Sequence, residues 1–308
     1  MTKFNVLILG NASAAPTLSR NQTAQLINID EQYFLMDCGE GTQLRLREHN
    51  IKFQRINHIF ISHLHGDHFL GLMGLLQTMH LLGRQTDLHI YSCGHVEEIV
   101  HVHLKHAKGN IGYPIHYHTV GTDQSELVFE DHKVEVHSIP LKHKIPCTGF
   151  LFREKQKPRK VNPEGLKKYK VPRFEIARIK AGEDFIDAGG NTVPNDALTF
   201  APDASHAYAF CSDTAYLESI IPIIEGVDLL YHEATFLEEH RDRAGQTLHA
   251  TAAQAATIAL KSRVKKLIIG HFSNRYSDLE LLLNEAKSIF EATEIAEQDR
   301  CFDLLKSQ

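Results

Sequence analysis

The sequence predicts an α/β protein in which two mixed β-sheets pack together and carry helices on both outer faces, an αββα four-layer sandwich. Three observations lead to this prediction. Strand-like and helix-like segments alternate along the 308 residues, the early strand-like segments are separated by hairpin-length connections, and only the stretch 153–202 lacks the pattern of a packed element. Hairpin spacing near the start argues against one doubly wound parallel sheet, whose strands need long crossover connections.

Short apolar runs bounded by turn residues predict the strands of both sheets. In chain order these runs are 4–10, 24–30, 33–39, 58–62, 88–92, 134–139, 148–152, 207–213, 227–233 and 265–271. Helical periodicity lies between several of the runs and after the last. The helix-like segments are 42–49, 70–82, 96–106, 217–224, 252–261 and 278–290.

Residues 1–308 are interpreted as a single domain, with residues 153–202 as an inserted basic arm. The arm holds five of the ten prolines, so it does not read as a packed element. From Leu151 to Lys180 there are eleven Lys or Arg against three Glu, a net charge of +8, whereas the rest of the chain carries -13. A surface that binds a polyanion and a solvated lysine-rich loop both fit this segregation of charge.

The chain shows neither a targeting segment nor a membrane span. The first 17 residues lack a hydrophobic segment followed by a cleavage site, and nothing approaches the ~20 apolar residues of a transmembrane helix. The five cysteines are scattered and form no CxxC pair, so we interpret them as buried free thiols. We therefore expect a cytoplasmic protein with no membrane partner.

The stretch "ISHLHGDH" places four metal-capable side chains directly after an apolar strand. His63 and His65 alternate and can face one metal ion, whereas Asp67 and His68 begin a helix-like segment and can face a second. Imidazole nitrogens and carboxylates suit zinc, and the absence of thiolates favours a catalytic site over a closed structural one. The HxHxDH pattern therefore predicts a metal site.

Two metal ions need more ligands than this turn supplies, and three later strand ends offer them. His143 ends "VHSIPLKH", Asp213 ends "YAFCSD", and His271 ends "KKLIIGH". A carboxylate such as Asp213 can bridge two cations ~3.5–4 Å apart, as in two-metal hydrolytic sites. Taken singly, a histidine at a strand end is more often a structural residue, but the shared position favours the metal interpretation.

Several further motifs carry a resemblance to a known family. The HxHxDH motif resembles that of the metallo-β-lactamase superfamily, and the remaining motifs resemble those of the ribonuclease Z family, tRNA 3′-end processing endonucleases, over nearly the whole chain. These motifs are "LGNASAAPTLSRN" at the start, "DCGEGTQ" from Asp37, "CSDT" around Asp213, "HEATF" from His232, "LHAT" around His249 and "GHFSNRY" from Gly270. The metallo-β-lactamase fold that the resemblance implies is the αββα sandwich.

The resemblance also implies ligands, substrate and assembly. His63, His65, His143 and Asp213 would hold one zinc ion, and Asp67, His68, His271 and again Asp213 the other, giving two Zn²⁺ per subunit. The substrate would be precursor tRNA, cut after the discriminator nucleotide to leave a 3′-hydroxyl on the tRNA and a 5′-phosphate on the trailer. A homodimer is implied, in which the arm of one subunit presents tRNA to the active site of the other.

Further roles follow for individual residues. Asp67 would accept the proton of the attacking water, whereas Glu233 would orient His249, which donates a proton to the leaving oxygen. Arg275 and Ser273 would contact the substrate backbone, since arginine binds phosphate through two parallel hydrogen bonds. Structural alternatives stay open: a helix N-terminal charge for Glu233, a capping or surface residue for His249, and a surface ion pair for Arg275.

The arm departs from the family pattern. Ile179, Lys180 and Gly182 match the end of the tRNA-binding element, so Lys180 is a candidate substrate contact. The glycine–proline pair expected before it is replaced by "VPRFE", residues 171–175. The basic character fits phosphate binding, but the altered tip leaves the docking mode open.

Three alternatives remain at this point. Six other histidines could form a third metal site, although an exposed helix with scattered histidines is the preferred interpretation of His95, His101, His103, His106, His116 and His118. The dinuclear site alone would also suit a small-molecule phosphodiesterase, lactonase or arylsulfatase. A catalytically inactive RNA-binding relative is disfavoured, because such a protein should have lost ligands.

Overall fold

The computed structural model describes residues 3–306 and divides the chain into two compact units. Of the described residues, the larger unit, which we call the body, comprises 3–130, 136–152 and 206–306. The second unit comprises residues 131–135 and 153–205 and includes the basic arm.

Two seven-stranded sheets form the centre of the body. The first has the order β18-β1-β2-β3-β4-β5-β6. Its pairs from β1 to β3 are antiparallel, and its pairs from β3 to β6 are parallel. Its strands are β1 (Phe4–Gly10), β2 (Ala24–Ile29), β3 (Gln32–Met36), β4 (Ile56–Ile61), β5 (Leu88–Ser92), β6 (Ile115–Thr119) and β18 (Cys301–Asp303). The antiparallel part is the hairpin-spaced region of the sequence.

The second sheet has the order β17-β16-β15-β14-β9-β8-β7, and β14 to β17 run parallel. Its strands are β7 (Leu127–Glu130), β8 (Val134–Pro140), β9 (Thr148–Glu154), β14 (Ala207–Cys211), β15 (Leu229–Glu233), β16 (Lys266–Gly270) and β17 (Thr293–Ile295). Both sheets are therefore mixed, as the sequence predicts.

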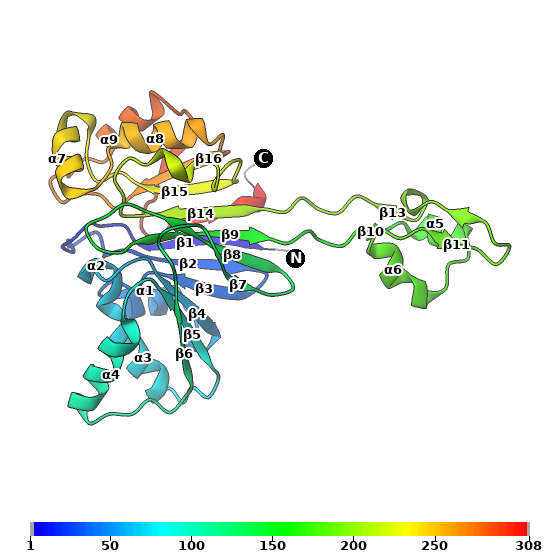
Figure 1. Cartoon of the computed structure of the whole chain (residues 1–308), viewed down its shortest axis with the longest axis horizontal. Coiled ribbons are helices and arrows are strands. Elements are labelled where there is room, and N and C mark those ends of the chain that lie inside the picture. Colours follow the sequence, from blue (N-terminus) through cyan, green and yellow to red (C-terminus); the bar gives the residue numbers. More distant parts are fainter. Residues whose placement is uncertain (1–2, 307–308) are drawn as a thin grey trace. The chain divides into compact units, whose positions relative to one another are not determined.

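Helices cover the outer face of each sheet (Figure 1). On the first sheet they are α1 (Thr42–Glu48), α2 (Gly66–Phe69), α3 (Gly71–Leu81) and α4 (Val96–Ala107); on the second they are α7 (Arg241–Thr247), α8 (Ala252–Lys261) and α9 (Glu280–Lys287). The second unit contains α5 (Pro163–Lys168), α6 (Ile176–Lys180) and two short sheets, β10 (Lys160–Val161) with β13 (Thr199–Phe200) and β11 (Phe185–Ile186) with β12 (Thr192–Val193).

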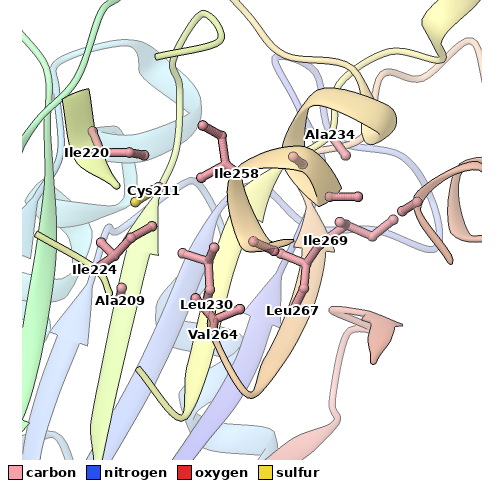
Figure 2. Packing of buried hydrophobic residues seen from close by; sticks show 14 of the residues in the cluster. Ala209, Cys211, Ile220, Ile224, Leu230, Ala234, Ile258, Val264, Leu267 and Ile269 are labelled. Carbon is pink, nitrogen blue, oxygen red and sulfur yellow. The ribbon is translucent and has the colours of Figure 1, made fainter. Parts of the chain in front are cut away.

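Three apolar layers hold these elements together. Between the sheets, Phe60 of β4 lies 5.0 Å from Phe150 and 5.3 Å from Phe152 of β9, measured between ring centroids. One outer layer packs α1, α3 and α4 on the first sheet. In the other, Ile258 of α8 faces Leu230 of β15 and Ile269 of β16 (Figure 2). The αββα prediction is confirmed.

Helix α8 shows how the sequence builds the outer layer. Thr251 caps its N-terminus and forms a capping box with Gln254, which satisfies two backbone N–H groups that the helix leaves unpaired. Small apolar residues recur at helical spacing and bring α8 close to the sheet. They are Ala252, Ala255, Ala256, Ile258 and Ala259.

Some predicted elements are wrong. The helix expected at 217–224 is only a 3₁₀ turn at Glu218–Ile220, because Pro222 has no backbone N–H with which to continue the helical hydrogen bonds. Strands β6, β7, β17 and β18, helix α7 and the elements within residues 153–202 have no counterpart among the predicted elements. The expectation that 153–202 lacks a packed element is wrong, because Ile179, Phe185, Val193 and Leu198 form a small buried core there. His116 and His118 lie on strand β6, so the exposed-helix interpretation is also wrong for them.

Two further expectations concern the cysteines and membrane-spanning helices. All five cysteines are free thiols; Cys38, Cys147 and Cys211 are buried as expected, whereas Cys93 is half-buried and Cys301 is exposed. Within the described residues no helix is long and apolar enough to cross a membrane.

Candidate metal centre and active site

The candidate site lies in the body, where strands of both sheets end. His63 to His68 follow β4, Asp213 follows β14, Glu233 ends β15, and His271 follows β16. The parallel register pairs Cys211 with His232 and Glu233 with Gly270, so these strand ends meet at one edge of their sheet. Loops after parallel strands are the usual place for ligand sites in α/β proteins.

One group of ligand atoms consists of three imidazoles and a carboxylate. His65 Nδ1 lies 3.1 Å from His63 Nε2 and 3.2 Å from His143 Nε2. Asp213 Oδ2 lies 3.6 Å from His63 Nε2 and 3.8 Å from His143 Nε2. The four ligand atoms are all within 4.8 Å of one another, close enough to coordinate one cation.

A second group uses the other oxygen of the same aspartate. Asp213 Oδ1 lies 3.1 Å from His271 Nε2 and 3.4 Å from His68 Nε2. Asp67 Oδ2 is 3.3 Å from His271 Nε2 and 3.5 Å from His68 Nε2. The structure therefore brings together all seven predicted ligands, with Asp213 between the two groups.

The chemistry of these side chains fits metal ions. Burial and neighbouring imidazoles lower the pKa of His63 to about 2, so its ring is neutral and offers a lone pair. Burial also lowers the pKa of His65 and of His143. Burial opposes ionisation of Asp213, but the surrounding imidazoles hold its pKa well below the ordinary value. Neutral imidazoles and ionised carboxylates are the ligand forms that divalent transition metals require.

Hydrogen bonds orient the ligands from behind. Asp37 Oδ2 lies 2.6 Å from His68 Nδ1, and Asp37 also accepts hydrogen bonds from Ser62 N and Oγ at 2.7 and 2.9 Å. Thr235 Oγ1 contacts His271 Nδ1 at 3.0 Å, and the carbonyl of Leu248 contacts His143 Nδ1 at 3.0 Å. These partners direct the Nε2 atoms of the three histidines toward the ligand groups.

Three residues around the site have left-handed backbone conformations. Asp37, Leu248 and His271 have φ values of 56°, 57° and 57°. Such values are uncommon for residues other than glycine and occur more often at functional sites. The conformation of His271 turns the chain directly after β16.

Glu233 and His249 form a buried pair beside the ligands. His249 Nδ1 lies 2.8 Å from Glu233 Oε1, while Glu233 Oε2 accepts hydrogen bonds from Thr235 Oγ1 at 2.6 Å and Ala250 N at 3.1 Å. Burial favours a neutral ring, but the charge of Glu233 and its hydrogen bond raise the pKa of His249 to about 9. Glu233 ends strand β15, so it is not a charge at a helix N-terminus. His249 precedes Thr251, the N-cap of α8, so it is not the capping residue.

A cavity of about 530 Å³ opens onto this centre. Its lining includes Asp67, Asp213 and His249, together with Ser273 and Lys144. Arg275 is exposed beyond the lining, with its guanidinium 5.3 Å from the ring centroid of Phe236. Among the described residues Arg275 forms no ion pair, so the alternative role as a partner in a surface ion pair does not apply.

Lys180 lies elsewhere, in the second unit. Together with Lys157 and Arg159 it lines a pocket of about 420 Å³. The predicted site residues thus divide into a group around the candidate metal centre in the body and one arm residue.

Sequence reasoning missed several residues of this site. Asp37, Ser62, Thr235 and Lys144 were not assigned a role, and the Leu248 carbonyl has no side-chain signature at all. Asp37 follows β3, so the rule that polar residues gather at strand ends could have found it.

Comparisons with known proteins agree with this arrangement. A protein named Ribonuclease Z from Bacteroides thetaiotaomicron is 48% identical to this chain, and the similarity covers 99% of this chain and 96% of that protein. A Ribonuclease Z from Bacteroides fragilis is 46% identical, covering 99% of this chain and 100% of that protein. The crystal structure of the short form of human tRNase Z is 26% identical, with a TM-score of 0.70, and the alignment covers 97% of this chain and 99% of that chain.

Residues 4–156 also match the family model described as anti-Pycsar protein Apyc1. That match includes the HxHxDH segment but omits Asp213, Glu233, His249 and His271. The two Ribonuclease Z relatives above, in contrast, are similar over 99% of this chain. On this identity and coverage, the chain belongs to the ribonuclease Z family.

Proposed function

We propose that this chain is the endoribonuclease that removes the 3′ trailer of precursor tRNA, cutting after the discriminator nucleotide and leaving a tRNA 3′-hydroxyl and a trailer 5′-phosphate. One observation carries the proposal. The two ligand groups joined by Asp213 and the Glu233–His249 pair converge at one cavity, in a chain 48% identical to a Ribonuclease Z over nearly its whole length.

Two zinc ions are proposed as the cofactors. His63, His65, His143 and Asp213 would hold one, and Asp67, His68, His271 and Asp213 the other, because each group offers imidazole nitrogens and carboxylate oxygens and neither offers a thiolate. When bound, such ions activate water at neutral pH and offset the charge that develops on the phosphodiester.

The acidic residue Asp67 is proposed to take the proton of the attacking water. Burial opposes its ionisation, but His68 and His271 hold the pKa of Asp67 far below its ordinary value, so the carboxylate is ionised. The backbone N–H of Ala14 donates to Asp67 Oδ2 at 2.7 Å and fixes its orientation. Asp67 also lines the cavity, within reach of a bound substrate.

The leaving 3′ oxygen needs a proton, and His249 is proposed to donate it. Glu233 accepts the Nδ1–H of His249, which leaves the Nε2–H for transfer. Because the pKa of His249 is raised to about 9, the ring carries both protons at neutral pH. General acids of this kind contribute typically 10²–10⁴-fold to a rate.

The arm is proposed to bind the phosphate backbone of tRNA. Five of its cations form no ion pair among the described residues: Lys167, Lys168, Lys170, Arg173 and Lys180. Phe174, at the tip that departs from the family pattern, is 78% exposed. Unpaired cations beside an exposed aromatic ring suit phosphate contacts and base stacking, and such binding weakens steeply with salt.

Assembly and location rest on the family resemblance. We propose a homodimer in which the arm of one subunit presents tRNA to the site of the other, and a cytoplasmic location. In the body, Ser273 and Arg275 are proposed as substrate contacts, with Arg275 supported by the ring of Phe236.

The test is cleavage of a 3′-extended precursor tRNA by zinc-loaded protein, compared with the metal-free protein and with Asp67→Ala. Asp123→Asn, in an exposed loop, serves as the matched control. Cleavage that requires metal, is lost in Asp67→Ala and is kept in Asp123→Asn supports the proposal. If bis(p-nitrophenyl) phosphate is hydrolysed but the RNA is never cut, the metal centre stands and a small-molecule hydrolase replaces the nuclease.

A further inference from the structure

A second cluster of metal-capable side chains lies on the first sheet, outside the centre described above. Asp87 immediately precedes β5, His89 lies on β5, and His116 and His118 lie on the edge strand β6. None of these four residues contributes to the proposed catalytic centre.

The register of the sheet brings the histidines to one face. Strands β5 and β6 are parallel and pair His89 with His116 and Tyr91 with His118. Leu88 and Ile90 of β5 are buried in the outer apolar layer, and Ile115 and Tyr117 of β6 pack against it. Side chains alternate along a strand, so the histidines must point to the opposite face, and a slip of one residue would expose the apolar set.

The donor atoms are close together. Asp87 Oδ2 lies 2.9 Å from His116 Nε2, and His89 Nδ1 lies 3.0 Å from His118 Nε2. Ligand atoms of Asp87, His89 and His116 are all within 4.8 Å of one another. The ring of His89 stacks on that of His116 with centroids 4.8 Å apart, and the ring of His118 stacks on Tyr91 at 4.4 Å.

Two features prepare this cluster for a cation. The backbone at Asp87 is held in place because the buried guanidinium of Arg84 donates to the main-chain carbonyls of Asp87 and Thr86 at 2.6 and 2.8 Å. Two imidazole nitrogens 3.0 Å apart cannot both carry a proton, so at least one lone pair faces the gap between His89 and His118. Burial and the adjacent imidazoles lower the pKa of His89 and of His118, which favours neutral rings.

We propose that Asp87, His89 and His116, with His118 beside His89, bind a divalent transition-metal ion such as Zn²⁺ that joins strands β5 and β6 at the sheet edge. The two imidazoles and one carboxylate whose ligand atoms lie within reach of one ion suit zinc, copper or nickel and do not suit calcium or magnesium. The side chains of Asp87 and His116 are 56% and 46% exposed, so the ion can enter from solvent and exchange. This site does not depend on the proposed catalytic function.

The experiment counts zinc in the intact protein. Metal-free wild type, His116→Gln and Asp87→Asn are dialysed against the same micromolar free Zn²⁺, and bound zinc is measured by mass spectrometry of the metal. His103→Gln is the matched control, because His103 is exposed on α4 and belongs to no cluster of ligand atoms. We expect wild type and His103→Gln to hold one zinc ion more per chain than the two cluster variants.

Precursor tRNA cleavage and circular dichroism accompany the count. Both cluster variants should keep folding and activity, since neither residue touches the catalytic centre. Equal zinc content in wild type and both variants would overturn the proposal and reduce the cluster to hydrogen-bonded surface residues. If His116→Gln disturbs folding, Asp87→Asn decides the question, because it keeps the size and the backbone contacts of Asp87.

Discussion

Asp37 controls the orientation of a ligand without being one. Its Oδ2 lies 2.6 Å from His68 Nδ1, and its Oδ1 accepts the backbone N–H of Ser62 at 2.7 Å. Asparagine tolerates the left-handed backbone of this position, so Asp37→Asn removes the negative charge behind His68 while preserving the turn. We predict a loss of zinc affinity of roughly 10–100-fold, measured by competition with a chelator. An affinity equal to that of the Asp123→Asn control would contradict the role of Asp37.

His249 provides a prediction that separates proton donation from metal binding. His249→Ala should reduce cleavage of precursor tRNA by roughly 10²–10⁴-fold, because the poor 3′-alkoxide leaving group needs a proton. Hydrolysis of bis(p-nitrophenyl) phosphate should fall far less, since p-nitrophenolate leaves without one. Rates on both substrates, with zinc content measured in parallel, provide the check. Equal losses on the two substrates would assign His249 a structural or metal-binding role.

At this scale, the HxHxDH motif, strand-end position and the family resemblance together select the seven ligand candidates that the structure brings together. Positioning contacts were harder to foresee. Thr235 supports both Glu233 and His271 through a single hydroxyl, and His143 is oriented by a backbone carbonyl. Thr235 lies in the "HEATF" motif but its role is not evident there, because the contact with His271 joins two loops 36 residues apart; a backbone carbonyl leaves no residue pattern at all.

At the scale of elements, glycine at the start of α3 lets the helix approach the loop after β3. A Cβ at Gly71 would lie 2.1 Å from the carbonyl oxygen of Gly39, whereas a Cβ at Gly245 in α7 would meet nothing within 4 Å. Gly71→Ala should therefore lower the free energy of unfolding by about 1–3 kcal/mol. Gly245→Ala should raise it by up to about 1 kcal/mol through helix propensity.

Urea denaturation of the two variants measures both changes. The pair is matched because each glycine is helical and each becomes alanine. A neutral Gly71→Ala would mean that the loop carrying Asp37 and the helix after the HxHxDH motif can separate without cost.

Most elements were predictable because their residues have one buried face. All ten predicted strands exist, since apolar residues bounded by turns have few alternatives to a buried sheet. The missed strands β6, β7, β17 and β18 are the edge strands of the two large sheets. Strands β6 and β7 have mostly exposed or half-buried residues, and their histidines and glutamates hide the apolar alternation. The helix predicted at 217–224 relies on the apolar content of the segment and neglects Pro222, which limits the segment to a single turn.

At the scale of the whole molecule, the arm can be removed without cutting the apolar layers of the body. Its own small core consists of Ile179, Phe185, Val193 and Leu198. The chain leaves and re-enters at adjacent strands β9 and β14, where Ser205 Oγ donates to the carbonyl of Lys155 at 3.1 Å. A short glycine–serine linker in place of 156–204 can therefore close the gap.

This deletion should leave hydrolysis of bis(p-nitrophenyl) phosphate intact and weaken precursor tRNA binding strongly. The salt dependence of binding should become shallower, because fewer phosphate contacts remain. Binding measured over a range of salt concentrations checks both statements. Unchanged affinity would show that the arm is only a solvated loop.

The proposed dimer makes a further prediction about the same variant. Mixing the arm-deleted protein with Asp67→Ala after subunit exchange should restore part of the precursor cleavage that each lacks, because an intact arm would then serve an intact site across the dimer. Single-turnover cleavage by the mixture measures the recovery. No recovery, with mixed dimers demonstrated by differential tagging, would contradict an arm acting across subunits.

The most direct test of the central claim is the position of the cut. One precursor tRNA carrying either a short or a long 3′ trailer is incubated with zinc-loaded protein, and the ends of both products are mapped. We predict one cut after the discriminator nucleotide for both trailers, with a 3′-hydroxyl on the tRNA and a 5′-phosphate on an intact trailer. A ladder of shortened trailers, or a cut that moves with trailer length, would contradict endonucleolytic tRNA 3′-end processing.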